Sequence, residues 1–203
     1  MFCRYLSQGQ RAGHRKHFVQ RQSCGGEIRR GYRKHQKRKR VSEITIREFS
    51  LPYQDEVCQL ILDIQQNEFH VPITISDQPD LLTIPEFYQN GRGNFWIALH
   101  EGKVAGTIAL VDFSAHQAAL RKMFVQKNYR GKEWGTAQKL MDELLRWASE
   151  KSIDEIYLGS LSQMHAAHSF YRRNGFTEIP KGNLPLNFPL VHVDSVFFER
   201  RMS

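Results

Sequence analysis

The sequence contains few cysteines and no long hydrophobic segment. Only three of its 203 residues are cysteine, at positions 3, 24 and 58, and they do not form the even, regularly spaced set of a disulfide-rich secreted protein. No apolar segment approaches the roughly 20 residues that a membrane-spanning helix needs. We therefore expect a cytoplasmic protein that does not associate with a membrane.

Familiar catalytic and metal-binding signatures are also absent. The sequence has no HExxH motif and no Ser-His-Asp arrangement, and residues 91–93 (Gly-Arg-Gly) lack the rest of a dinucleotide-binding fingerprint. Cys24, His35 and the neighbouring histidines do not have the spacing of zinc ligands. These absences argue against a metalloprotease, a serine hydrolase and a dehydrogenase, and we expect no metal.

Acidic residues are almost missing from the first 40 positions. Residues 1–40 contain 13 Lys and Arg but one acid, Glu27, whereas residues 41–203 contain 16 Lys and Arg and 20 Asp and Glu. The overall net charge of +8 therefore comes from the basic leader, residues 1–40. The leader has too few aliphatic residues to bury a core and is expected to be disordered. Residues 41–203 are long enough for one ordinary domain.

Three interpretations of the leader stay open. Its aromatic residues lie among cations, as in tails that bind RNA, DNA or the ribosome. Its excess of Arg over acids suits an organelle transit peptide, although serine is scarce and histidine frequent. Finally, no Met occurs between Met1 and Met123 while the globular pattern begins at Val41, so the leader need not belong to the native protein. We expect nucleic-acid binding, if any, only through residues 1–40.

The most informative segment is residues 123–137. A strand-like run from Met123 to Val125 leads into a basic, glycine-containing turn, residues 130–135. Apolar residues then recur with helical spacing, at Ala137, Leu140, Met141, Leu144, Leu145 and Ala148. The turn therefore lies at a helix N-terminus, where free amides, the helix dipole and cations favour an anion such as phosphate. The alternative is a plain connection with solvated charges.

A second motif occupies residues 166–176. The sequence Ala-Ala-His-Ser-Phe-Tyr-Arg-Arg-Asn-Gly-Phe predicts a short helix that ends at an Asn-Gly cap, followed by the start of a strand. The order of strand, anion-binding turn, helix, strand (155–158) and Phe-Tyr-x-x-Asn-Gly-Phe helix closely resembles the GCN5-related N-acetyltransferase (GNAT) family. The resemblance covers about residues 43–203, and the two motifs are specific in this order and at this separation.

The rest of the pattern agrees with the fold of that family. Expected strands lie near 44–49, 95–99, 104–111, 119–125, 155–158 and 191–200. Expected helices are one that buries Val57, Leu60, Ile61 and Ile64, a short one near 81–88 interrupted by Pro85, one after Gly135, and one at 164–174. The resemblance implies an α+β fold with a single mixed, mostly antiparallel sheet and a splayed parallel strand pair flanked by helices, the acyl-CoA N-acyltransferase fold.

The resemblance also implies acetyl-CoA as cosubstrate. The strands at 119–125 and 155–158 would separate at their ends and admit pantetheine, whose amides satisfy the unpaired backbone groups of Met123 and Val125. The residues implied to bind the cosubstrate are Met123, Phe124, Val125, Arg130, Gly131, Lys132, Gly135, Thr136 and Ala137. The side chains of residues 123–125 would at the same time be ordinary strand core.

The phosphate turn departs from the family pattern Gln/Arg-x-x-Gly-x-Gly/Ala. If the pattern starts at Arg130, Glu133 takes the place of the first glycine, and an anion beside a pyrophosphate is unfavourable. If it starts at Lys132, only the first position differs and the loop after Arg130 is two residues longer. We prefer the second register, with Glu133 turned outward and Trp134 partly packed. A damaged loop that binds no cofactor is the alternative.

Tyr171 is the expected catalytic residue. By resemblance its hydroxyl points at the cofactor sulfur and protonates the leaving thiolate, and an ordinary tyrosine pKa of about 10 suits a proton donor better than a base. Without the motif, a core tyrosine would be the simpler interpretation. His165 and His168 are expected to be solvated or capping residues. Met164 stands where the family often has an Asn that contacts the cofactor.

The sequence does not single out a general base or an acceptor. The chemically suitable side chains are Asp112, Glu68, His70, His192 and Asp194, and a water molecule could serve instead. Residues 184–190 (Leu-Pro-Leu-Asn-Phe-Pro-Leu) are apolar and stiffened by proline. We expect this segment to form one wall of the acceptor cleft, which favours a small molecule over a long peptide.

These observations predict an acetyl-CoA-dependent N-acetyltransferase, monomeric or homodimeric, that transfers an acetyl group directly to an amine of a small molecule or an amino-acid-like acceptor. Two alternatives come from other functional classes. One is a CoA-binding sensor or degenerate family member without turnover, which Glu133 would favour. The other is a nucleic-acid- or ribosome-associated protein that acts through residues 1–40.

Overall fold

The computed structural model of the protein describes residues 43–202, which belong to one compact unit. The expectations about the basic leader, and the predicted domain boundary at residue 41, lie outside the described residues. Among residues 43–202, no helix is both long enough and apolar enough to cross a membrane. No group of three or more His, Cys, Asp or Glu side chains in the same part of the chain could hold a metal ion.

A single seven-stranded sheet forms the centre of the fold, with the strand order β1-β2-β3-β4-β5-β7-β6. The strands are β1 (Thr45–Glu48), β2 (Asn94–His100), β3 (Lys103–Ser114), β4 (Gln117–Val125), β5 (Glu155–Ser160), β6 (Thr177–Ile179) and β7 (Val196–Arg201). Only β4 and β5 run parallel, and all other neighbours are antiparallel. The predicted mixed, mostly antiparallel sheet is therefore confirmed.

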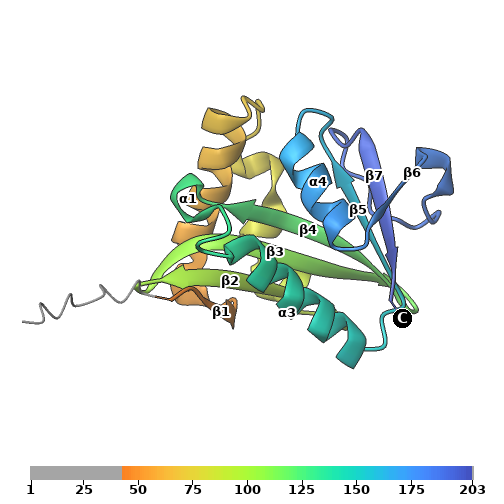
Figure 1. The fold of residues 1–203 in the computed structure, drawn as a ribbon, viewed down its shortest axis with the longest axis horizontal. Coiled ribbons are helices and arrows are strands. Elements are labelled where there is room, and N and C mark those ends of the chain that lie inside the picture. The colour runs from red at the N-terminus through yellow and green to blue at the C-terminus, as the bar shows by residue number, and fades with distance from the viewer. Residues whose placement is uncertain (1–42, 203) are drawn as a thin grey trace, which may run out of the picture. The chain divides into compact units, whose positions relative to one another are not determined.

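Helices cover both faces of the sheet (Figure 1). They are α1 (Gln54–Asp63, continued by a π turn at Ile64–Glu68), α2 (Ile84–Tyr88), α3 (Thr136–Glu150) and α4 (His165–Arg173). Successive residues of a strand point to opposite faces, and β2 is apolar on both. Trp96 and Ala98 pack with α3 and α4, whereas Phe95, Ile97 and Leu99 pack with α1 and α2.

The predicted elements are present, with two corrections. Pro85 does not interrupt the short helix; it occupies the first turn of α2, where its missing N–H costs no hydrogen bond. The last strand begins at Val196 and not at Val191, because the chain turns before it with Asp194 N–H donating to the Val191 carbonyl (3.0 Å). The strand expected to start after the Asn-Gly cap of α4 is present as the short strand β6, which pairs with β7.

The parallel pair separates as predicted. β4 and β5 are in register only from Gln117–Glu155 to Ala119–Tyr157. Beyond Ala119, β4 continues beside β3 up to Val125, while β5 continues beside β7 up to Ser160. Among residues 43–202, no strand therefore pairs with one edge of β4 over its last residues.

Candidate active site

The predicted phosphate turn lies between β4 and α3. Residues 130–135 lead to α3, which begins at Thr136 with Gly135 as its N-cap. Gly131 and Gly135 have φ angles of 102° and 62°, a left-handed conformation that favours glycine. A Cβ on Gly135 would meet nothing within 4 Å, so the space there is open. The first amides of this 15-residue helix, including those of Thr136 and Ala137, have no acceptor within the helix.

The side chain of Arg130 fixes the end of β4 and does not point freely at a ligand. Its Nε donates to the Val125 carbonyl (2.7 Å), and its two terminal nitrogens pair with the carboxylate of Glu68. This hydrogen bonding holds the pKa of Glu68 below its ordinary value. Lys132 is exposed and forms no ion pair with any of residues 43–202. Lys132 is therefore the cation of this turn that stays available.

Trp134 lies as predicted, whereas Glu133 does not. Trp134 is half-buried, in edge contact with His100 and Tyr129 at ring distances of 5.0 and 5.1 Å, as expected. Glu133 is exposed, but its carboxylate folds back over Gly131: a Cβ on that glycine would lie 2.6 Å from the Glu133 oxygens. The carboxylate thus lies along the turn and does not point straight outward.

The unpartnered edge of β4 presents backbone groups to the gap between β4 and β5. Gln126 N–H donates to the Ala105 carbonyl on β3 (2.9 Å). Because amides alternate in direction along a strand, the amide of Val125 points away from β3, toward the gap, and Met123 lies on the same side. Since Arg130 already donates to the Val125 carbonyl, the group left available at this residue is its N–H.

A bulge in β4 precedes this edge. Thr107 pairs with Phe124 and Ala109 pairs with Arg121, so β4 has one residue more than β3 between these pairs. Lys122 has φ of 50°, and its carbonyl accepts a hydrogen bond from Thr107 Oγ1 (2.6 Å). A bulge of this kind redirects side chains and bends the strand.

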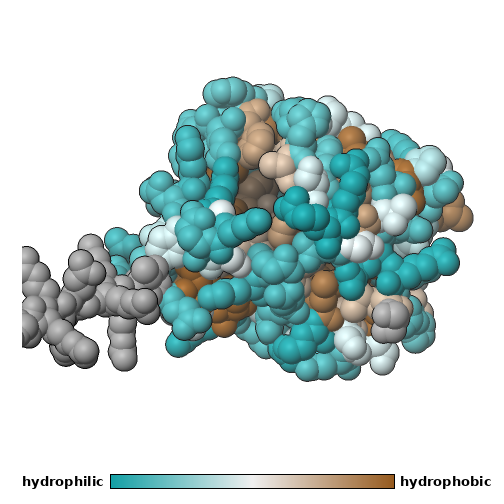
Figure 2. All heavy atoms as spheres, in the orientation of Figure 1, coloured by the Kyte–Doolittle hydropathy of each residue, from teal (hydrophilic) through white to brown (hydrophobic). Residues whose placement is uncertain are grey.

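A cavity of about 570 Å³ occupies the gap between the separating strands. It is lined by residues 120–124 of β4, by Gly159 and Ser160 of β5, by Tyr171 of α4, and by the segments 71–88 and 189–194. Figure 2 shows the molecular surface hollowed between α1 and α4, with apolar residues at the bottom of the hollow. A cavity of this size suits a small molecule.

Tyr171 is buried beside this cavity. Its ring contacts Phe176 and Phe198 at centroid distances of 5.9 and 5.8 Å, yet its hydroxyl has no hydrogen-bond partner among residues 43–202. Burial, and secondarily the negative charge of Asp194, raise the pKa of Tyr171 above its ordinary value. The hydroxyl therefore keeps its proton at neutral pH and could donate it into the cavity.

Comparisons with known proteins agree with this geometry. Residues 91–178 match the family described as "Acetyltransferase (GNAT) domain". The chain is 40% identical to an acetyltransferase of GNAT family from Staphylococcus aureus Mu50, covering 79% of this chain and 99% of that one with a TM-score of 0.76. The chain belongs to the GNAT family of N-acetyltransferases.

Two further GNAT comparisons differ in what they cover. Over 102 residues the chain is 35% identical to N-acetylaspartate synthetase from Xenopus tropicalis, matching 49% of this chain and 37% of that protein. The matched part spans between 37% and 57% of the curated relatives' lengths. A PaiA N-acetyltransferase from Thermoplasma acidophilum, solved in complex with coenzyme A, shares the fold at 17% identity, with a TM-score of 0.61, over 79% of this chain and 99% of that one.

Of the five side chains considered as a general base for this GNAT protein, one lines the cavity. Asp112 is held by Arg92 at 2.8 Å, Glu68 is held by Arg130, and the two histidines are exposed. Asp194 instead lines the cavity with Tyr171. Its carboxylate packs against Gly159, and burial raises its pKa to about 6.

The histidines of α4 and the predicted cleft wall need correction. His168 is buried, and its Nε2 lies 3.1 Å from both Ser160 Oγ and the Leu161 carbonyl; it ties α4 to the end of β5 and is not a solvated residue. His165 is exposed, as expected. Of the segment 184–190, only Pro189 and Leu190 line the cavity, and Leu186 is fully exposed.

Sequence reasoning missed a polar network beside the bulge. Lys122 Nζ lies 3.0 Å from Asp80 and 2.7 Å from Gln78 Oε1, and Tyr88 donates its hydroxyl proton to Asp80. Burial lowers the pKa of Lys122, although Asp80 opposes the shift. The network ties β4 to the segment before β2. The one available signal was the pair Arg121-Lys122 inside an otherwise apolar strand.

Proposed function

We propose that this GNAT protein catalyses direct transfer of the acetyl group of acetyl-CoA to the amine of a small-molecule or amino-acid-like acceptor. The observation that carries the proposal is the unpartnered edge of β4, which lines the cavity and is followed along the chain by the N-terminus of α3. A donor edge for pantetheine would thus be followed in the chain by an anion site for pyrophosphate.

The residues present fit a coenzyme A pyrophosphate at the start of α3. The free amides of Thr136 and Ala137 lie at the positive end of the helix dipole, whereas the Gly135 N–H already donates to the Gly131 carbonyl (3.1 Å). The space around Gly135 is open. Lys132 supplies an available cation. Arg130 contributes indirectly, because it fixes the Val125 carbonyl and Glu68. The coenzyme A complex of the fold neighbour from Thermoplasma acidophilum supports the same class of cosubstrate.

Two groups of this chain would support the acyl-transfer step itself. An N–H at the β4 edge, from Val125 or Met123, would donate to the thioester carbonyl oxygen and stabilise the negative charge that develops there. The buried hydroxyl of Tyr171 would give its proton to the departing sulfur. The thioester itself supplies an activated acetyl group.

A small acceptor is favoured by the size of the cavity, about 570 Å³, which must also hold the end of the pantetheine. The relative named N-acetylaspartate synthetase acts, by its name, on an amino acid, which supports the amino-acid-like class. The cytoplasmic location and the homodimer stay predictions, as does a role of residues 1–40 toward nucleic acid.

Isothermal titration of acetyl-CoA and of S-acetylpantetheine into the full chain tests the proposal. We expect micromolar binding of acetyl-CoA and roughly 100-fold weaker binding of the pantetheine, because charge-assisted hydrogen bonds to the pyrophosphate contribute about 1.5–3 kcal/mol each. No binding of acetyl-CoA by the folded chain would refute the proposal.

The Tyr171→Phe variant separates an enzyme from a CoA-binding sensor. In an enzyme, kcat should fall by roughly 100-fold while acetyl-CoA affinity stays the same, since the hydroxyl acts only in the transition state. A protein that binds acetyl-CoA, acetylates no amine and is indifferent to this substitution would be a sensor.

A further inference from the structure

Five charged side chains line the cavity between β4 and β5: Asp77, Asp80, Arg121, Lys122 and Asp194. In three of them the charged group is already engaged by an ion pair or by two hydrogen bonds. Asp80 pairs with Lys122 at 3.0 Å, and Asp77 accepts hydrogen bonds from the backbone and hydroxyl of Thr74 at 2.8 and 2.7 Å. The charges left for a ligand are those of Arg121 and Asp194.

Arg121 and Asp194 are close enough to influence each other but do not pair. The positive charge of Arg121 lowers the pKa of Asp194, yet neither side chain forms an ion pair with any of residues 43–202. Arg121 donates to the Pro189 carbonyl and lies 6.0 Å from the Phe188 ring, which fixes its position and leaves other N–H groups available. The Asp194 carboxylate accepts no hydrogen bond in the described part of the chain.

Two opposite charges that line one cavity without forming an ion pair carry an uncompensated desolvation cost, unless a ligand pairs with both. A guanidinium binds a carboxylate through two parallel hydrogen bonds, and a carboxylate accepts from an ammonium group. We infer that the acceptor is an amino acid or another amine that carries a carboxylate, bound with its carboxylate on Arg121 and its amino group at Asp194. This inference rests on the proposed function and names its substrate class.

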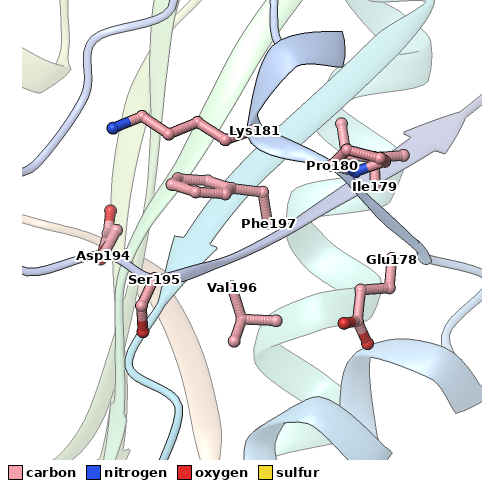
Figure 3. A pocket seen from close by; sticks show the side chains of 8 residues that line it. All are labelled: Glu178, Ile179, Pro180, Lys181, Asp194, Ser195, Val196 and Phe197. Carbon is pink, nitrogen blue, oxygen red and sulfur yellow. The ribbon is translucent and has the colours of Figure 1, made fainter.

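Asp194 also has access to a second cavity. A space of about 510 Å³ lies at the β6–β7 side of the same carboxylate, lined by residues 178–181 and 194–197. Figure 3 shows Asp194 and Ser195 at the start of β7, with the Lys181 side chain extending over the same end of this cavity. A proton received by Asp194 on the acceptor side therefore has an open, polar path to solvent on the other side.

The proposed step conserves protons and electrons. The acceptor ammonium gives one proton to Asp194, and the neutral nitrogen then forms a bond to the thioester carbon. As the carbon–sulfur bond breaks, its electron pair goes to sulfur, which takes the proton of Tyr171. The second proton that the nitrogen loses returns to Tyr171 directly or through water. One proton, that held by Asp194, passes to solvent, and the products are the N-acetyl acceptor and free coenzyme A.

The pH dependence follows from the groups around Asp194. Burial raises its pKa to about 6, against the opposing effects of Arg121 and His192. Tyr171 faces it from α4, and residues of the second cavity face it from the other side, namely Lys181 and Glu178, of which Glu178 pairs with Arg172. Because only the ionised carboxylate accepts a proton, kcat/KM should fall as the pH drops below about 6.

The experiment uses the full chain with acetyl-CoA and matched acceptors, namely each amino acid and its neutral α-amide. We expect kcat/KM for the best amino acid to exceed that of its amide by at least about 30-fold, in line with a lost charged hydrogen-bond pair. Arg121→Gln should remove this preference by raising KM for the acid alone, and Arg121→Lys should restore part of it. Asp194→Asn should lower kcat and remove the acid limb of the pH profile.

Three outcomes would overturn the inference while leaving the proposed function intact: amides that match or exceed the acids, an equal loss for both in Arg121→Gln, or an unchanged acid limb in Asp194→Asn. Binding of acetyl-CoA without acetylation of any amine would defeat the proposed function, and the inference with it. Titration of acetyl-CoA into each variant shows whether a loss is confined to the acceptor side.

Discussion

Gly159 on β5 controls the position of Asp194, and Gly159→Ala should therefore impair catalysis without removing any functional group. A Cβ at this position would lie 2.1 Å from Asp194 Oδ2, 2.5 Å from its Cγ and 2.8 Å from its Cβ. Because even the root of the Asp194 side chain is too close, rotation of the carboxylate alone does not relieve the clash. The residue must move as a whole.

The size of the effect follows from these distances. An ordinary contact begins near 3.4 Å, so the closest carboxylate oxygen has to move by about 1.3 Å, the difference between 3.4 and 2.1 Å. A misplacement of about 1 Å in a reacting group can cost roughly 100-fold in rate. Overpacking of this kind typically destabilises a protein by about 1–3 kcal/mol, which a normal domain tolerates. We expect kcat/KM to fall by about 100-fold with a modest loss of melting temperature.

The assay compares Gly159→Ala with Gly182→Ala, a matched control in which the added Cβ meets nothing within 4 Å. Steady-state kinetics with the preferred acceptor, titration of acetyl-CoA and thermal melts are measured for both variants. Affinity for acetyl-CoA should be unchanged, since the displaced group lies on the acceptor side. If Gly159→Ala keeps the kcat/KM and pH profile of the control, the position of Asp194 does not matter to the reaction, and the reasoning fails.

Three further predictions concern the cofactor side. Gly135→Ala should weaken acetyl-CoA binding by roughly 10-fold, because a left-handed residue with a Cβ is strained by about 1–2 kcal/mol. The control is Gly102→Ala, at a glycine that is also left-handed (φ 79°) and open; it should have the same strain but an unchanged affinity for acetyl-CoA. If titration gives both variants the same affinity for acetyl-CoA, no ligand lies at Gly135. Glu133→Gln should tighten acetyl-CoA binding a few-fold at low salt through loss of an exposed anion; an unchanged Kd would place the carboxylate outside the phosphate field. Glu68→Gln should lower the free energy of unfolding by at most about 1 kcal/mol at pH 7, because the side chains of Arg130 and Glu68 are 37% and 33% exposed. Because the pKa of Glu68 is lowered by folding, this contribution is present above the unfolded pKa and lost as the pH falls through the folded value; a thermal-melt difference that persists at pH 3 would contradict the assignment.

The fold was largely predictable because its signals are local. The apolar run of β2, the helical spacing of α3 and the Asn-Gly end of α4 each occupy one continuous stretch of sequence. The element bounds that escaped prediction are those that depend on partners distant in sequence. β6 has three residues and exists because β7 pairs with it, and the segment before β7 turns because Ser195 N–H donates to the Ser160 carbonyl (3.0 Å).

The proposed cofactor and acceptor halves of the site also differ in whether their residues are local in the sequence. The proposed cofactor half is one continuous run from Met123 to Ala137, so a motif could name its residues. The proposed acceptor half joins Arg121 of β4 to Asp194 of a loop, and no spacing rule links them. Arg121 and Lys122 also illustrate why side-chain direction was hidden: neighbours on a regular strand point to opposite faces, yet both line the same cavity. The bulge at Lys122, with its positive φ, removes the alternation, and nothing in the sequence marks it. If Arg121 binds the acceptor as proposed, acceptor specificity depends on this backbone irregularity. Substitutions that straighten the bulge, such as loss of the Thr107 hydroxyl that donates to the Lys122 carbonyl, should therefore change the choice of acceptor before they change the affinity for acetyl-CoA.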